Sequence, residues 1–209
     1  MAPMSSTEPG AVYSAADRRR LLELAARSIE HGLERGAPLS VDPQDYPETL
    51  QASRATFVTL EIGGQLRGCI GVLQAFRPLV VDVAQNTYAA AFEDPRFPGL
   101  RPAEFPRLEI HISVLSPAEP LRFSSEADLL DQIRPGIDGL ILQDRGQRGT
   151  FLPSVWEQLP RPEQFLEHLK RKAGLPFGHW SDTLQVARYT TESFGATVTE
   201  LFGDAPVRA

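Results

Sequence analysis

ATFVTLEIGGQLRGCIGVL, residues 55–73, is the stretch that decides the fold of this chain. It holds two runs of strand-forming residues on either side of the pair Gly63-Gly64. β-branched and aromatic side chains favour strands, and paired glycines supply the positive φ angles that a tight hairpin turn requires. The stretch therefore predicts a β-hairpin with strands at 55–62 and 65–72.

Helices and a further strand are predicted on both sides of this hairpin. Ser14 is a helix N-cap residue, and the apolar residues that follow it keep helical spacing up to a stop at Gly36. Pro78 favours the first turn of a second helix, which ends near Phe92. Apolar and polar residues alternate along 108–115, which is typical of a half-buried strand.

The second half of the chain predicts a separate group of elements. Pro117 and Pro120 mark a change in composition, which we interpret as a boundary between two lobes. Beyond it the sequence predicts a helix at 125–133, a hairpin at 140–152, helices at 154–158 and 162–173, and closing strands at 184–189 and 197–202. Because hairpins and helices follow one another without regular βαβ alternation, the sheets should be antiparallel and the fold class α+β.

The composition excludes several broad classes of protein. The 209 residues are 42% hydrophobic and 23% charged, which is enough to build a packed core. A net charge of −6 argues against nucleic-acid binding, and the single cysteine excludes an internal disulfide or a multi-cysteine metal site. No apolar run approaches the roughly 18 residues of a membrane-spanning helix, so no membrane partner is expected. We expect a flexible leader at 1–13 without a signal peptide, and a cytoplasmic protein.

The segment LRGCIG, residues 66–71, is the strongest candidate for chemistry. Alternation along a strand places Arg67, Cys69 and Gly71 on one face, and an adjacent cation favours the reactive thiolate form of cysteine. The functional interpretation is a nucleophilic or redox-active Cys69 beside an anion-binding Arg67. The structural interpretation is a small buried side chain, because free cysteine is among the most buried residue types. Gly68 and Gly71 inside a strand indicate a bulge or a close approach by another group.

Further candidate residues lie at the exit of the second helix and on the strand 108–115. Asp94 and Arg96 could orient a substrate or fix their proline-rich loop, and Asn86 could contact a ligand or solvent. His111 could accept the proton of Cys69 if strand order brings the two together, with Glu109 or Ser113 as its orienting partner. Its structural alternative is a hydrogen-bonded histidine on a half-buried strand. His31, His168 and His179 show no mutual spacing typical of a metal site, so no metal is expected.

Several segments, in order along the chain, resemble the AMMECR domain family, whose bacterial and archaeal members are called AmmeMemoRadiSam system protein A. The matching segments are 57–60, 64–71, 92–98, 112–117, 149–153 and 172–175, together with Asn86 and Ala90. The resemblance implies a two-lobed α+β fold, with a five-stranded antiparallel sheet in the larger lobe and a three-stranded one in the smaller lobe. It also implies that the hexapeptide 66–71 faces a cleft between the lobes. No activity is established for the family, but its members occur with a Memo-like protein and a radical SAM protein, which implies a shared modification pathway.

The predicted organisation is a large lobe at 14–117 and 184–209 and a small lobe at 118–183. Two functions fit it. The first is an enzyme or enzyme component, without a cofactor, that acts in the cleft around Cys69 and uses His111 as a base. Its substrate-binding residues would be Arg67, Gly68, Gly71, Asn86, Asp94 and Arg96. The alternative is a non-catalytic protein-binding module or scaffold that uses the same cleft.

Overall fold

The computed structural model describes residues 12–203, so most of the predicted leader lies outside the described residues. Its last residue, Tyr13, is only 4% exposed and belongs to a hydrophobic core, so the leader cannot extend that far. The described chain divides into two compact units, one made of residues 12–115 and 192–203 and the other of Ser116–Thr191. Each unit combines helices with a four-stranded sheet around its own core, which confirms the α+β class.

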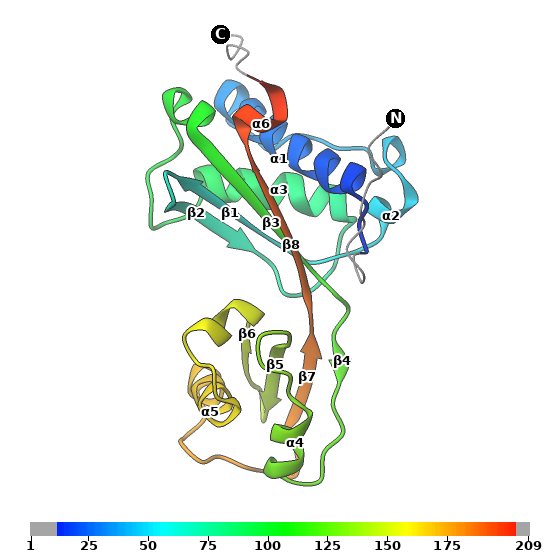
Figure 1. Cartoon of the computed structure of the whole chain (residues 1–209), viewed down its shortest axis with the longest axis vertical. Coiled ribbons are helices and arrows are strands. Elements are labelled where there is room, and N and C mark those ends of the chain that lie inside the picture. The colour runs from blue at the N-terminus through cyan, green and yellow to red at the C-terminus, as the bar shows by residue number, and fades with distance from the viewer. Residues whose placement is uncertain (1–11, 204–209) are drawn as a thin grey trace, which may run out of the picture. The chain divides into compact units, whose positions relative to one another are not determined.

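Two long helices, α1 (Ala15–Arg35) and α3 (Leu79–Phe92), pack together and cover one face of the first unit's sheet (Figure 1). The Ser14 side chain accepts a hydrogen bond from the Asp17 N–H at the start of α1, and Gly36, with φ of 66°, ends it as predicted. The shorter helices of this unit are η1 (Pro43–Asp45), α2 (Glu48–Gln51), η2 (Pro102–Arg107) and α6 (Val198–Phe202).

The first sheet has the strand order β2-β1-β3-β8, with β2 at one edge (Figure 1). Its strands are β1 (Thr56–Ile62), β2 (Gln65–Gly71), β3 (Leu108–Leu115) and β8 (Thr191–Thr197). Val58, Leu60, Ile110 and Ile112 are fully buried beneath the helices, because they occupy alternate positions on one side of the sheet. The opposite side is half-exposed. We call it the polar face, after its side chains Thr59, Glu61, Cys69, Glu109, His111 and Ser113.

The second unit is built on the sheet β4-β7-β5-β6. Its elements are β4 (Glu119–Pro120), α4 (Glu126–Gln132), β5 (Gly139–Asp144), β6 (Gln147–Phe151), η3 (Pro153–Glu157), α5 (Pro162–Lys172) and β7 (Gln185–Tyr189). The rings of Trp156 and Phe165 stack in its core with their centroids 3.8 Å apart. Across residues 12–203, none of the helices combines the length and apolarity that crossing a bilayer requires.

The predicted strand count of five and three is wrong, because each sheet has four strands. The strand predicted at 184–189 is β7, which pairs with β5 of the second unit rather than with the first sheet. The strand predicted at 197–202 is the helix α6, which begins with a capping box between Thr197 and Glu200. The fourth strand of the first sheet is β8, directly before that helix.

Candidate functional site

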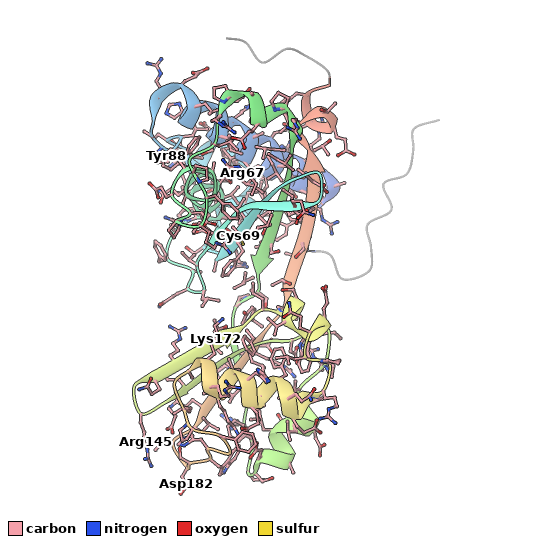
Figure 2. All side chains as sticks on the ribbon, turned by 90° about the vertical axis from the view of Figure 1, so that its left-hand side faces the viewer. Arg67, Cys69, Tyr88, Arg145, Lys172 and Asp182 are labelled. Atoms are coloured by element: carbon pink, nitrogen blue, oxygen red, sulfur yellow. The ribbon has the colours of Figure 1, made fainter. Side chains whose placement is uncertain are left out.

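Cys69, labelled in Figure 2, lies on the edge strand β2, and its backbone is hydrogen-bonded to side chains outside the sheet. Its N–H donates to Asp94 Oδ2 at 2.9 Å, and its carbonyl accepts a hydrogen bond from Arg96 Nη2 at 3.1 Å. An edge strand otherwise presents unpaired N–H and C=O groups. The Asp94 and Arg96 side chains therefore supply the hydrogen bonds that the N–H and carbonyl of Cys69 would otherwise make with a neighbouring strand.

Asp94 is the more tightly bound member of this pair, at 4% exposure. Its two carboxylate oxygens accept four hydrogen bonds, three from Arg96 and one from Cys69. The Arg96 guanidinium holds the pKa of Asp94 well below its ordinary value, because it stabilises the ionised carboxylate. The Arg96 side chain remains 53% exposed. Asp94 is thus committed to the fold, whereas Arg96 also presents a cation to solvent beside Cys69.

The two glycines of the LRGCIG segment are required by packing. A Cβ atom on Gly68 would overlap the backbone carbonyl oxygen of Ala90 in α3, so β2 and α3 approach each other only because this residue has no side chain. A Cβ atom on Gly71 would overlap the Phe57 ring and the Thr56 carbonyl oxygen. Their predicted part in substrate binding stays a prediction, since close packing already accounts for both.

Arg67 does not follow the predicted strand alternation, because β2 has a bulge at this residue. Leu60 lies opposite Gly68 and Glu61 lies opposite Leu66, so Arg67 is the additional residue between them. Its guanidinium is directed to the segment after α3: Nε donates to Glu104 Oε1 at 2.9 Å, and Nη2 donates to the carbonyl of residue 98 at 2.9 Å. An anion-binding role for Arg67 beside the thiol stays a prediction.

The ion pair between Arg67 and Glu104 is largely shielded from water, with side chains 11% and 15% exposed. The Arg67 guanidinium lowers the pKa of Glu104 to about 2, since its hydrogen bonds stabilise the carboxylate. Within the described residues, Arg67 Nη1 is buried and has no hydrogen-bond partner. This pair fixes η2 to β2, and the sequence pattern alone did not link Glu104 to the site.

The Cys69 sulfur belongs to the polar face. Thr59, directly opposite on β1, donates a hydrogen bond from Oγ1 to Sγ at 3.2 Å, and Cys69 is only partly buried. Thr59 in turn lies opposite His111 on β3, so the three side chains form one row across three strands. The arrangement presents an oriented thiol to any molecule that binds over the polar face.

His111 shares the polar face with Cys69 but is not its neighbour. Adjacent strands are about 4.8 Å apart, so the two residues are separated by roughly 10 Å, and direct proton transfer needs about 3 Å. His111 Nε2 lies 3.1 Å from Glu109 Oε1 and 4.0 Å from Glu61 Oε2. Ser113, the other expected partner, bonds instead to Ser193 at 2.8 Å between hydroxyl oxygens. If His111 acts as the base for Cys69, the proton must therefore pass through an intervening group.

Asn86 lies in a buried polar cluster beneath the sheet, at 3% exposure. Its Nδ2 donates to Asp82 Oδ2 at 2.9 Å and to Thr56 Oγ1 at 2.9 Å, and its Oδ1 accepts from Arg77 Nη2 at 2.9 Å. Burial raises the pKa of Asp82 in the same cluster. Because the Asn86 amide is fully used inside the protein, its part in substrate binding stays a prediction that would require this cluster to open.

The AMMECR1 family model matches residues 22–194 of the chain. The chain belongs to the AMMECR1 family. A relative from Methanothermobacter thermautotrophicus is 40% identical over 163 residues, which cover 76% of this chain and 82% of the relative. One from Thermotoga maritima is 38% identical over 173 residues, covering 81% and 94%. The crystal structure of an uncharacterized protein from Pyrococcus horikoshii is 34% identical, with a TM-score of 0.73, and covers 85% of this chain and 90% of that one.

In this AMMECR1-family chain the candidate residues separate into two groups. Asp94, Arg96 and Cys69 meet at the β2 edge, and His111 joins Cys69 only through the row on the polar face. Arg67 and Asn86 do not join them, because Arg67 binds Glu104 and Asn86 binds Asp82. Residues that the sequence pattern did not single out are Thr59, Glu61, Glu104, Asp82 and Arg77. Strand register, or contact between distant segments, brings Thr59, Glu61 and Glu104 to their partners. Asp82, in contrast, lies one helical turn before Asn86, and Arg77 lies just before the same helix.

Proposed function

We propose that this AMMECR1-family chain is an enzyme component whose reacting group is the thiol of Cys69. One observation carries the proposal: the N–H and the carbonyl of Cys69 are both hydrogen-bonded, and its sulfur lies on the polar face with the hydroxyl of Thr59 as its partner. A nucleophile needs a fixed position and access to its substrate. Cys69 combines a backbone fixed by hydrogen bonds with a residue that is only partly buried.

The chemistry proposed is addition of the sulfur to an electrophilic carbonyl carbon. The C–S bond forms as the carbonyl π bond breaks, and the carbonyl oxygen takes up the proton that the thiol loses. The Thr59 hydroxyl orients the sulfur through its hydrogen bond. Arg96, half-exposed beside Cys69, is the cation best placed to contact a polar substrate group, and Asp94 is a positioning residue that holds both.

A second function, a non-catalytic protein-binding module, is favoured by a different observation. Arg67 and Asp94 are both committed to internal ion pairs, and Gly68 is committed to the contact with α3. The hexapeptide could therefore serve mainly to build a rigid surface. The two functions differ in what they require of the Cys69 sulfur, since only the enzyme needs its nucleophilicity.

The test uses the fact that Cys69 is the chain's single cysteine. Tagged wild-type protein and the variant Cys69→Ser are recovered from the native host, and both are analysed by intact-mass and peptide mass spectrometry. The enzyme proposal expects a covalent adduct on the peptide that contains Cys69, absent from Cys69→Ser. Equal recovery of the same partner proteins by both, with no adduct, would instead support the binding module.

A second measurement examines the thiol environment directly. The variant Thr59→Val removes the hydroxyl while keeping the side chain's shape, so it should change the alkylation rate of Cys69 severalfold. Thr49→Val, at an exposed position in α2, is the matched control and should leave the rate unchanged. Identical rates in all three proteins would show that Thr59 has no part in orienting the sulfur.

We further propose that the chain acts in the cytoplasm on a modification pathway with a Memo-like protein and a radical SAM protein. This rests on the family resemblance of the LRGCIG segment and of residues 92–98. Co-expression of the three proteins followed by affinity purification tests it, and the expected result is co-elution that survives Cys69→Ser. The cleft predicted between the lobes stays a prediction, and every contact used above lies within the first unit.

A further inference from the structure

Three potential metal ligands meet on the polar face, away from the thiol. Glu61 of β1 lies directly opposite Glu109 of β3, and His111 follows two residues after Glu109 on the same side. One ligand atom from each residue lies within 4.8 Å of the other two. The side chains are 31%, 41% and 37% exposed, so an ion from solvent can reach them. The cluster lies wholly within the first unit.

The two glutamates are an unfavourable pair in isolation. Like charges directly opposite each other on neighbouring strands destabilise a sheet. Among residues 12–203, the only ion-pair partner within 4.0 Å of either carboxylate is His111, at 3.1 Å from Glu109 and 4.0 Å from Glu61. No lysine or arginine nitrogen of the described chain lies within 4.0 Å of either carboxylate. A bound cation would supply the missing positive charge.

The two distances from His111 Nε2 match those between ligands on a single ion. Zinc lies about 2.0–2.2 Å from imidazole nitrogen and carboxylate oxygen, so two of its ligand atoms are roughly 3–4 Å apart. The 3.1 Å and 4.0 Å distances from His111 Nε2 fall in this range. The other ring nitrogen, Nδ1, packs against Gly195 of β8, where a Cβ atom would overlap it. The glycine thus makes room for the ring in the orientation that turns Nε2 toward the carboxylates.

We propose that Glu61, Glu109 and His111 bind one divalent transition-metal ion of the Zn²⁺ class. A mixed set of one imidazole and two carboxylates suits Zn²⁺ better than Mg²⁺, which prefers oxygen ligands alone. Three protein ligands leave at least one position open for water or a substrate atom. Metal binding here does not depend on the role of Cys69, although Thr59 lies only two residues from Glu61 on the same face.

Titration of the chelator-treated chain with Zn²⁺ by calorimetry tests the proposal. The titrations use a Cys69→Ser background, so that the thiol does not compete for the metal. We expect saturable binding of one Zn²⁺ per chain, and binding weakened roughly a hundredfold or more by Glu61→Gln, Glu109→Gln or His111→Gln. Mg²⁺ should bind far more weakly than Zn²⁺.

Matched controls separate this site from general surface binding. Glu163→Gln and His168→Gln alter exposed residues of α5 and should leave the Zn²⁺ affinity unchanged. In metal-free protein, Glu109→Gln should keep or raise the melting temperature, because it removes repulsion from Glu61, yet it should abolish the rise that Zn²⁺ produces in the parent. Absence of saturable binding, or binding equally affected by the control substitutions, would overturn the proposal.

Discussion

Replacing Asp94 by asparagine should loosen the edge of the first sheet at Cys69. Asp94 Oδ1 accepts from the N–H and Nε of Arg96, and Oδ2 accepts from Arg96 Nη2 at 2.6 Å and from the Cys69 N–H at 2.9 Å. Asparagine has one oxygen and one NH₂ group, and the NH₂ group cannot accept hydrogen bonds. In either orientation of the amide, two donors therefore lose their partner.

The size of the effect follows from these contacts. Hydrogen bonds to a charged group contribute about 1.5–3 kcal/mol each, and breaking a fully buried ion pair costs about 3–5 kcal/mol. Arg96 is half-exposed, so water compensates part of its loss. We therefore expect Asp94→Asn to lower the free energy of unfolding by about 3 kcal/mol, near the bottom of the range for a buried pair.

Urea denaturation followed by circular dichroism measures this change, with Asp45→Asn as the control. Asp45 is an exposed aspartate of η1 in the same unit, and its substitution should change stability by less than about 0.5 kcal/mol. Hydrogen exchange of the Cys69 amide should accelerate in Asp94→Asn at the same time, because its acceptor is weakened. A loss of stability no larger than that of Asp45→Asn would refute the assignment of Asp94 as the anchor of β2.

Three further predictions concern the surroundings of the site. Gly68→Ala should cost about 3 kcal/mol of unfolding free energy because its methyl group overlaps the Ala90 carbonyl, whereas Gly99→Ala, whose nearest neighbour would be 3.8 Å away, should cost under about 0.5 kcal/mol by the same assay. Asn86→Ala should cost about 3 kcal/mol in thermal or urea unfolding, because it leaves buried partners unsatisfied. The pKa of Glu104 is lowered from 4.5 to about 2, so the ion pair's contribution to the free energy of unfolding is present above pH 4.5 and is lost as the pH falls toward 2. Glu104→Gln should therefore make the free energy of unfolding less dependent on pH between 4.5 and 2.

The local elements could be predicted from the sequence because their signals are local. The cap at Ser14, the stop at Gly36 and the Gly63-Gly64 hairpin all depend on residues close together in the chain. The allocation of strands to sheets could not be predicted, since β7 and β8 are separated only by residue 190 and yet pair in different sheets. The capping box formed by Thr197 and Glu200 is a sequence pattern typical of a helix start, so α6 could have been predicted from it.

The position of Cys69 depends on the bulge in β2, which strand alternation alone does not predict. A two-residue hairpin with no irregularity would place Ile62 opposite Gln65 and, continuing the count, Val58 opposite Cys69. Val58 is fully buried, and cross-strand partners share a face, so Cys69 would then point into the core. The bulge at Arg67 shifts the pairing by one residue and places Cys69 opposite Thr59 instead.

That shift explains why the arginine and the cysteine of the LRGCIG segment separate. The residue that makes the bulge cannot keep the alternation of its strand, so Arg67 turns to Glu104 while Cys69 is turned outward to the polar face. Gly68 then takes the inward position, where α3 leaves no room for a side chain. Arginine, bulge and glycine thus act together to place on the polar face a side chain that the regular strand would direct into the core. Substitutions that retain this backbone and change only the sulfur, such as Cys69→Ser, are therefore the ones that separate chemistry from architecture.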